Sequence, residues 1–349
     1  MKKIFILLFA IGLITPAFAK ISINYTGFAG IGGSYKTIFD SYIAEYGTVS
    51  GDLFSSMADC FAITNTTQPV FGEGYRNLAV GVTGGVGVVT PPEKSAGSAT
   101  FGDVGIGVTA APFVTISLDP LYSVFGLGIF EDSDLTIKLL PLTIKPKISG
   151  NTWTMKFFNM GIILRKRIIS TMTLIPVLLS FEGVSVSLGT FYSNNKINGS
   201  ASISKTEKFD YSEGPLTGYV EGTISSLDLE VKTKSFSFDT EVKGYVNLLY
   251  ILDLFAGFGA TLNLSNTFEV NATIPASVKV TITSPAPGTS TDSGAIIISG
   301  DDSGKTFIPR LVGGFQINLG PVKIPVQSTY VLGTKNKSYA ITFGVTVSF

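Results

Sequence analysis

The sequence has no histidine and a single cysteine among 349 residues. Without histidine, Ser-His-Asp and Cys-His catalysis and histidine metal sites are excluded. Carboxylates or lysine would have to perform any catalysis, and the acidic clusters at 131–134 and 301–302 have the setting of solvated turns. We therefore predict no enzyme activity, catalytic residue, cofactor or bound metal. Cys60 has no disulfide partner and no histidine to activate it, so we predict a small buried hydrophobic residue there.

Charge is also scarce, at 14% of residues, compared with about 25% in typical soluble proteins. Basic and acidic residues balance at 25 each, which gives no support to a nucleic-acid partner. The mean hydropathy of +0.40 is that of a membrane protein. Yet the most apolar segment, 157–181, is interrupted by Arg165-Lys166-Arg167 and by Pro176, so no helical span is predicted.

The first 19 residues have the pattern of a secretory signal peptide. Lys2 and Lys3 precede an apolar run from Ile4 to Ile14, and Ala17-Phe18-Ala19 forms a small-residue cleavage site. The apolar run is too short for the alternative, an N-terminal membrane anchor. We predict cleavage after Ala19 and export of residues 20–349.

The chain ends in an evenly alternating segment. Its apolar positions are Tyr339, Ile341, Phe343, Val345, Val347 and Phe349, and small or polar residues lie between them. Similar alternation recurs at 78–88, 142–148, 252–264 and 315–319. Only helices and closed barrels satisfy every backbone hydrogen bond in lipid, so the pattern predicts an all-β fold, an antiparallel transmembrane β-barrel of about 12–14 strands.

Turn-forming residues predict the connections between these strands. Long loops are expected at 90–99, 192–200 and 284–305, and a short turn at 318–322. The apolar positions change parity between Val231 and Phe236, which predicts a bulge or turn near Thr233. Trp153 is expected as an aromatic anchor at the membrane interface. Arg165-Lys166-Arg167 is either a lipid head-group contact or a turn at the membrane edge.

Residues 34–65 depart from the strand pattern and predict two short amphipathic helices. Their apolar faces are Phe39, Tyr42, Ile43 and Tyr46, then Leu53, Phe54, Met57 and Phe61. The segment is a plug folded into the barrel lumen, a periplasmic helical cap, or a strand pair with a misleading pattern. Glycines alternating within 81–88 and 102–108 indicate close approach of another backbone, and an inserted plug is one reason for it.

The aromatic-terminated last strand and the signal peptide resemble those of the outer-membrane β-barrel proteins of double-membraned bacteria. The resemblance implies that Tyr339, Ile341, Phe343, Val345, Val347 and Phe349 form the sorting signal read by the barrel-assembly machinery, and that outer-membrane lipid is a partner. The helical N-terminal segment and apolar composition are also similar to long-chain fatty-acid transporter channels. Two functions stay open: a passive channel for small solutes, hydrophobic ones included, and a surface-exposed structural or interaction barrel without a conducting pore.

Overall fold

The computed structural model describes residues 22–28, 30–31, 35–38, 53–66, 78–90, 105–148, 151–175, 178–213, 216–333 and 337–349. Strands dominate this part of the chain, and they join in one antiparallel sheet of 13 strands. A short separate pair, β5 (Lys147–Ile148) and β6 (Asn151–Thr152), lies outside it. No helix among the described residues is long and apolar enough to cross a membrane.

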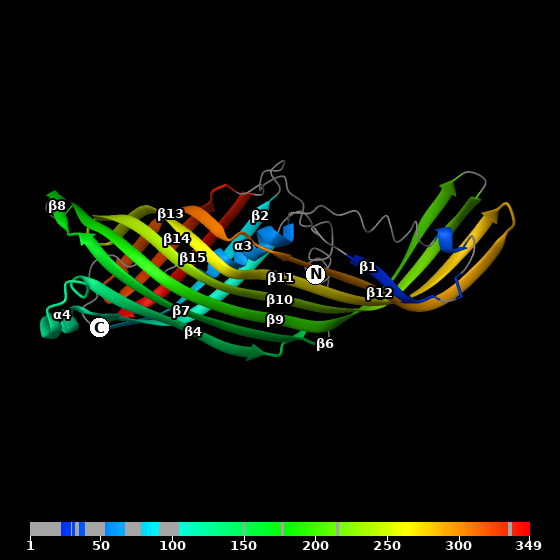
Figure 1. Ribbon diagram of the computed structural model, residues 1–349, viewed down its shortest axis with the longest axis horizontal. Helices are drawn as coiled ribbons and strands as arrows, with labels where there is room; N and C mark the ends of the chain where they lie inside the picture. Colours follow the sequence, from blue (N-terminus) through cyan, green and yellow to red (C-terminus); the bar gives the residue numbers. More distant parts are fainter. Residues whose placement is uncertain are drawn as a thin grey trace.

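Ten strands of the sheet close into a ring, which confirms the predicted barrel (Figure 1). In ring order they are β2 (Leu78–Thr90), β3 (Gly105–Ser117), β4 (Ser133–Ile144), β7 (Thr154–Ile169), β9 (Leu179–Glu213), β10 (Leu216–Leu248), β11 (Leu252–Ser284), β13 (Phe307–Leu319), β14 (Val322–Val331) and β15 (Lys337–Ser348). The pairing of β11 with β13 closes the ring. The 13-stranded sheet agrees with the predicted 12–14 strands, although three of its strands lie outside the ring.

Three strands are far longer than the ring requires: β9 has 35 residues, and β10 and β11 have 33 each. The first part of β11 pairs with β13, and its second part pairs with β12 (Gly288–Ser303). The edge strand β1 (Ser22–Gly27) pairs with β12. Figure 1 shows these strands continuing past the ring as an extension sheet, made of the far halves of β9, β10 and β11 together with β12 and β1.

On β10 the apolar side chains change from the inner face in the extension to the outer face in the ring. In the extension, Leu227, Leu229 and Val231 are buried on the inner face, while Glu230 and Lys232 lie on the outer face. In the ring the same inner face carries polar side chains, among them Ser235, Ser237, Asp239 and Glu241, and the outer face carries Phe236, Phe238 and Val242. The strand alternates without interruption while its surroundings change.

Neighbouring strands exchange polarity at the same level. Lys234 pairs with Asn194 of β9 and Thr267 of β11, whereas Phe236, two residues along, pairs with Tyr192. On β7 and β4 the outer face is apolar up to Phe158 and Pro141, which pair with each other. A continuous line across five strands therefore separates an apolar outer surface on the ring from a polar outer surface on the extension.

This line explains several wrong sequence predictions. The segment predicted as a loop at 192–200 belongs to β9, because its polar residues occupy the outer face of the extension. Most of the loop predicted at 284–305 is β12. The parity change near Thr233 is the exchange of faces, since Leu227 to Ser237 keep one inward alternation on β10; the nearby register shift lies at Phe236/Ser237.

Other connections agree with the sequence where they are described. A short turn joins β13 to β14 at Gly320, whose φ of 64° suits glycine. Most of the loop predicted at 90–99 lies outside the described residues. Outside the sheet's main strands the described residues also include helical residues at 35–38, the helices α3 (Leu53–Thr66) and α4 (Asp119–Phe125), and the strand β8 (Met172–Ile175), which pairs with β9.

Arg165-Lys166-Arg167 lies near the end of β7 and fastens the connection that contains α4. Arg165 forms an ion pair with Asp134, and its Nε donates to that carboxylate at 2.8 Å. Lys166 Nζ donates to the carbonyls of Gly128 and Glu131 at 2.6 and 2.8 Å. The predicted turn at this cluster is wrong, because all three residues belong to β7 and pair with β9.

Candidate functional site

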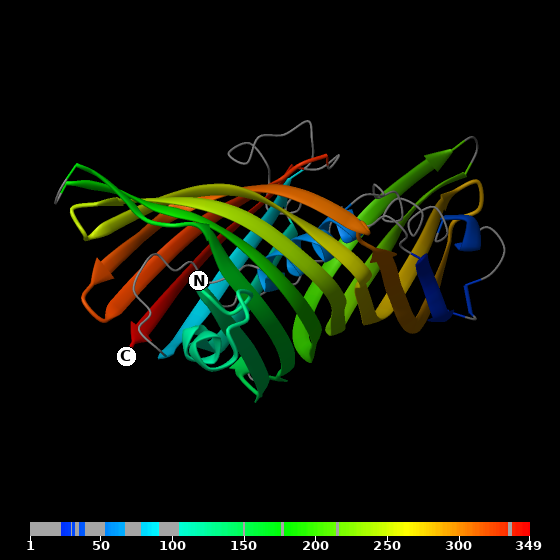
Figure 2. The same cartoon turned by 60° about the vertical axis from the view of Figure 1, so that its left-hand side comes forward.

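The helix α3 packs against the inner surface of the ring, contacting β2, β3 and β11 (Figure 2). Ala58, Cys60 and Ile63 are buried in this contact. Gly87 of β2 has no room for a Cβ because Cys60 Sγ lies there, and Gly107 of β3 touches the same sulfur. The glycines of these strands thus allow close approach of the helix, as the sequence suggested.

Cys60 is buried and free, which confirms the prediction of a small buried hydrophobic residue. Burial raises the pKa of its thiol to about 12. The thiolate, which is the reactive form, is therefore scarce at neutral pH.

Asp59 fixes α3 to the junction of β11, β12 and β13. Its Oδ1 accepts hydrogen bonds from Asn266 Nδ2 at 3.1 Å and from the backbone N–H of Lys305 at 2.7 Å. A Cβ on Gly304, between β12 and β13, would collide with the side chains of Asp59 and Asn266, so this contact requires glycine. Burial raises the pKa of Asp59 to about 7, against the opposing effect of the Lys305 hydrogen bond and charge.

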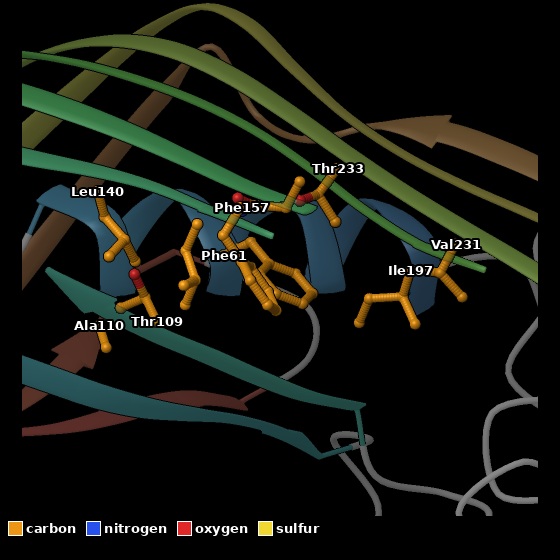
Figure 3. Close-up of a pocket in the computed structure, with 10 residues that line it drawn as sticks. Phe61, Thr109, Ala110, Leu140, Phe157, Ile197, Val231 and Thr233 are labelled. Carbon is orange, nitrogen blue, oxygen red and sulfur yellow. The ribbon is translucent and has the colours of Figure 1, made fainter. Parts of the chain in front are cut away.

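A pocket with a cavity volume of about 210 Å³ lies between α3 and the ring wall (Figure 3). Its lining is predominantly apolar and comes from α3, β3, β4, β7, β9 and β10. The residues are Phe61, Thr109, Ala110, Leu140, Leu142, Phe157, Asn195, Ile197, Val231 and Thr233. Phe61 also stacks on Phe268 of β11 with a centroid distance of 5.9 Å, which fixes the aromatic side of the pocket.

The pocket lies where β3 and β4 separate. These strands pair from Phe113–Lys138 to Ser117–Asp134, and no further pairs join them within the described range 105–148. By contrast, β2 pairs with β3 along nearly its whole length. Thr109 and Ala110 of β3, and Leu140 and Leu142 of β4, lie beyond the last pair and line the pocket. The pocket is therefore beside a local opening in the wall.

The lumen toward the short turns contains a cluster of buried charges. Arg310 donates to both carboxylate oxygens of Asp239, at 2.6 and 2.7 Å, and to Glu241 at 2.9 Å. Lys243 forms an ion pair with Glu241 and donates to Gln327 at 2.8 Å. Arg310 and Glu241 are 2% and 1% exposed, so this cluster is shielded from solvent inside the barrel.

The structure describes only part of the predicted plug. Phe39, Tyr42, Ile43 and Tyr46 lie outside the described residues, and Leu53 and Phe54 belong to α3 without described side chains. Met57 is buried in a core cluster, and Phe61 lines the pocket. The second predicted helix is therefore present as α3, while its function as a plug remains a prediction.

The last strand has the two faces expected from its alternation. Ile341, Phe343 and Val345 are exposed on the outer face of β15, and Ala340 and Thr342 are buried on the inner face. Tyr339 and Phe349 are also exposed, and Val347 is partly so. Their recognition as a sorting signal remains a prediction.

Trp153 corrects another sequence expectation. Its side chain is 5% exposed and packs with Leu227 and Leu229 in the inner core, so it is not an interface anchor. Gly199 leaves the space that the indole ring occupies. The sequence also gave no signal for the β3–β4 opening or for the position of Asn195 in the pocket.

The chain belongs to the Lsa36-like family, whose model matches residues 27–349. A comparison with curated proteins found no match. Among solved structures, the chain is similar to the CymD monoaromatic hydrocarbon channel at 9% identity, covering 85% of this chain and 97% of that one, with a TM-score of 0.25. The toluene transporter TbuX of Ralstonia pickettii has 7% identity, 85% and 94% coverage and a TM-score of 0.25.

The translocator domain of the autotransporter NalP from Neisseria meningitidis is also similar. It has 9% identity, covers 90% of this chain and 99% of that chain, and has a TM-score of 0.28. The predicted β-barrel is confirmed by the ring of ten paired strands, not by these likenesses. At TM-scores of this size the three structures do not inform the function of this chain.

Proposed function

We propose that the protein is an outer-membrane β-barrel that takes up small apolar solutes passively through the pocket beside α3. The observation that carries this proposal is the apolar cavity of about 210 Å³ at the point where β3 and β4 separate. A solute reaching that opening meets aliphatic and aromatic side chains, and its transfer from water is favourable. In this proposal α3 is the plug of the lumen, with Phe61 on its pocket side.

The apolar outer surface of the ring supports a membrane location. On β10 this surface extends from Phe236 to the end of the strand at Leu248. At about 3.3 Å per residue and a tilt near 45°, this length corresponds to roughly 30 Å, close to the apolar band of outer-membrane barrels. The line of polarity exchange would then mark one membrane boundary.

The position of the short turn and of the C-terminus supports one orientation of the barrel in the membrane. The short β13–β14 turn and the C-terminus lie at the end opposite the extension sheet, and short turns are periplasmic in such barrels. The extension would therefore stand outside the cell, and export would require the signal peptide and the barrel-assembly machinery.

One observation favours the second function, a surface barrel without a conducting pore. The buried Arg310 cluster lies in the lumen between the pocket and the short turns. A solute that continues along the lumen must displace this cluster, and breaking buried ion pairs costs several kcal/mol.

Uptake of the apolar fluorophore N-phenyl-1-naphthylamine by cells that display the barrel tests the proposal. We expect wild type to raise the rate of fluorescence increase above that of cells without the barrel. Leu140→Trp, which fills the pocket, should return the rate toward the background. Leu139→Trp is the matched control because Leu139 is exposed on the outer face of the same strand. Equal rates in wild-type and barrel-free cells would exclude uptake of this solute class.

A further inference from the structure

Asn195 is a polar residue within the apolar pocket. It lies on the inner face of β9, is 8% exposed, and lines the cavity together with Thr109 and Thr233. Its side-chain Nδ2 donates to Thr233 Oγ1 at 3.3 Å. Its Oδ1 is buried and has no hydrogen-bond partner among the described residues. The side chain therefore lines the cavity while its carbonyl oxygen has no hydrogen-bond partner within the described part of the chain.

An unused buried carbonyl is costly, because burial removes its water without replacing the hydrogen bond. A ligand group that donates to the oxygen recovers part of this penalty. The seven other lining residues besides Asn195 and the two threonines are aliphatic or aromatic. No residue of the lining is charged, so an ionic ligand would lose its hydration without gaining a counter-ion.

We propose that the pocket selects uncharged hydroxyl compounds, alcohols or phenols with a compact apolar body, and that the hydroxyl binds the Asn195 amide. A hydroxyl both donates and accepts, so it can satisfy the Asn195 carbonyl and also accept from a neighbouring threonine. The apolar body would lie against Phe61, Phe157 and Leu140. This inference rests on the proposed function and adds the residue that determines specificity.

The size of the cavity restricts the ligand further. Its volume of about 210 Å³ is below the range of about 300–1,000 Å³ that accommodates drug-sized ligands. One or two fused rings, or a short alkyl chain, are the bodies of suitable size. A long chain would have to protrude through the opening between β3 and β4.

The test compares 1-naphthol with 1-methylnaphthalene, which has a methyl group in place of the hydroxyl. Binding of each to the full-length mature protein in phospholipid nanodiscs is measured by naphthalene fluorescence, with partition into empty nanodiscs subtracted. We expect wild type to bind 1-naphthol about 2- to 10-fold more tightly, the range that one hydrogen bond supplies. Asn195→Leu should abolish this preference while it retains binding of 1-methylnaphthalene.

Asn194→Leu is the matched control, because Asn194 precedes Asn195 on β9 and is exposed on the opposite face. It should keep the wild-type preference. If wild type binds both probes equally, the hydroxyl selection is wrong while the apolar pocket stands. If wild type binds neither probe, the pocket fails as a solute site and the proposed function fails with it. The wild-type comparison decides the question even if Asn195→Leu does not fold.

Discussion

Asp59 is the residue at which the packing of α3 should depend on pH. Its carboxylate is buried between the Asn266 amide and the Lys305 backbone, and the charged groups that face it are Lys305 and Asp302. Burial raises its pKa from 3.8 to about 7. When α3 is packed, the Asp59 carboxyl keeps its proton up to about pH 7. When α3 is released, the same carboxyl loses its proton near its ordinary pKa of 3.8. Packing is strongest below the pKa of the released state and weakens as the pH rises through about 7.

Labelling of Cys60 by a maleimide tests this dependence, since the buried thiol becomes accessible when α3 leaves the wall. Asp59→Asn keeps the acceptor oxygen and removes the titration. The ratio of the wild-type to the Asp59→Asn rate cancels the intrinsic effect of pH on the thiol. We expect this ratio to rise several-fold between pH 5 and pH 9. A ratio that is constant across this range would contradict the pH dependence.

At the scale of the strand, polarity exchange without a break in alternation is the informative feature. On β4 the outer face changes from Leu139 and Pro141 to Thr143. The same change occurs on β7, β9, β10 and β11 at paired positions. Because β10 keeps its two faces throughout, its surroundings must change along the strand, as they do at a membrane surface. On β11 the buried positions change parity between Asn263 and Asn266, at the register shift opposite Phe236 and Ser237.

The position of this boundary can be measured with arginine substitutions on β4. We expect Leu139→Arg, which lies close to the boundary, to lower the free energy of unfolding in lipid by about 1–2 kcal/mol, between the ~2–4 kcal/mol of the bilayer midplane and the ~0–1 kcal/mol expected for Thr143→Arg. The reason is the depth dependence of burying a charge in hydrocarbon. Urea unfolding of the barrel in phospholipid vesicles provides both values. Equal costs at the two positions would place the boundary elsewhere.

For the whole molecule, the proposed channel would contain two obstructions in series within the barrel. The first is α3, held by Asp59 and accommodated by Gly87. The second is the Arg310 cluster nearer the short turns. An eight-stranded barrel is filled by its own side chains, and a ring of ten leaves little additional space, so both obstructions matter for conduction.

Single-channel conductance of the mature protein, with and without residues 35–63, separates their effects. We expect discrete steps in a planar bilayer that widen on deletion, because the deletion removes most of α3 from the lumen. Heat-modifiable electrophoretic mobility of both forms verifies the folded barrel. Silent bilayers from both folded forms would identify the Arg310 cluster as sufficient closure and favour the surface-barrel function.

Features that repeat along the chain or depend on a single strand follow from the amino-acid sequence alone. The alternation from Tyr339 to Phe349 specified two unlike faces, and the spacing of Met57 and Phe61 predicted α3. How far each strand pairs with its neighbour depends on contacts between distant parts of the chain. These contacts determine the extension sheet, the opening between β3 and β4, and the inward position of Trp153 and Asn195. Alternation along a strand shows which side chains share a face. Whether that face meets lipid, water or the protein interior depends on how the strand pairs with residues far away in the sequence.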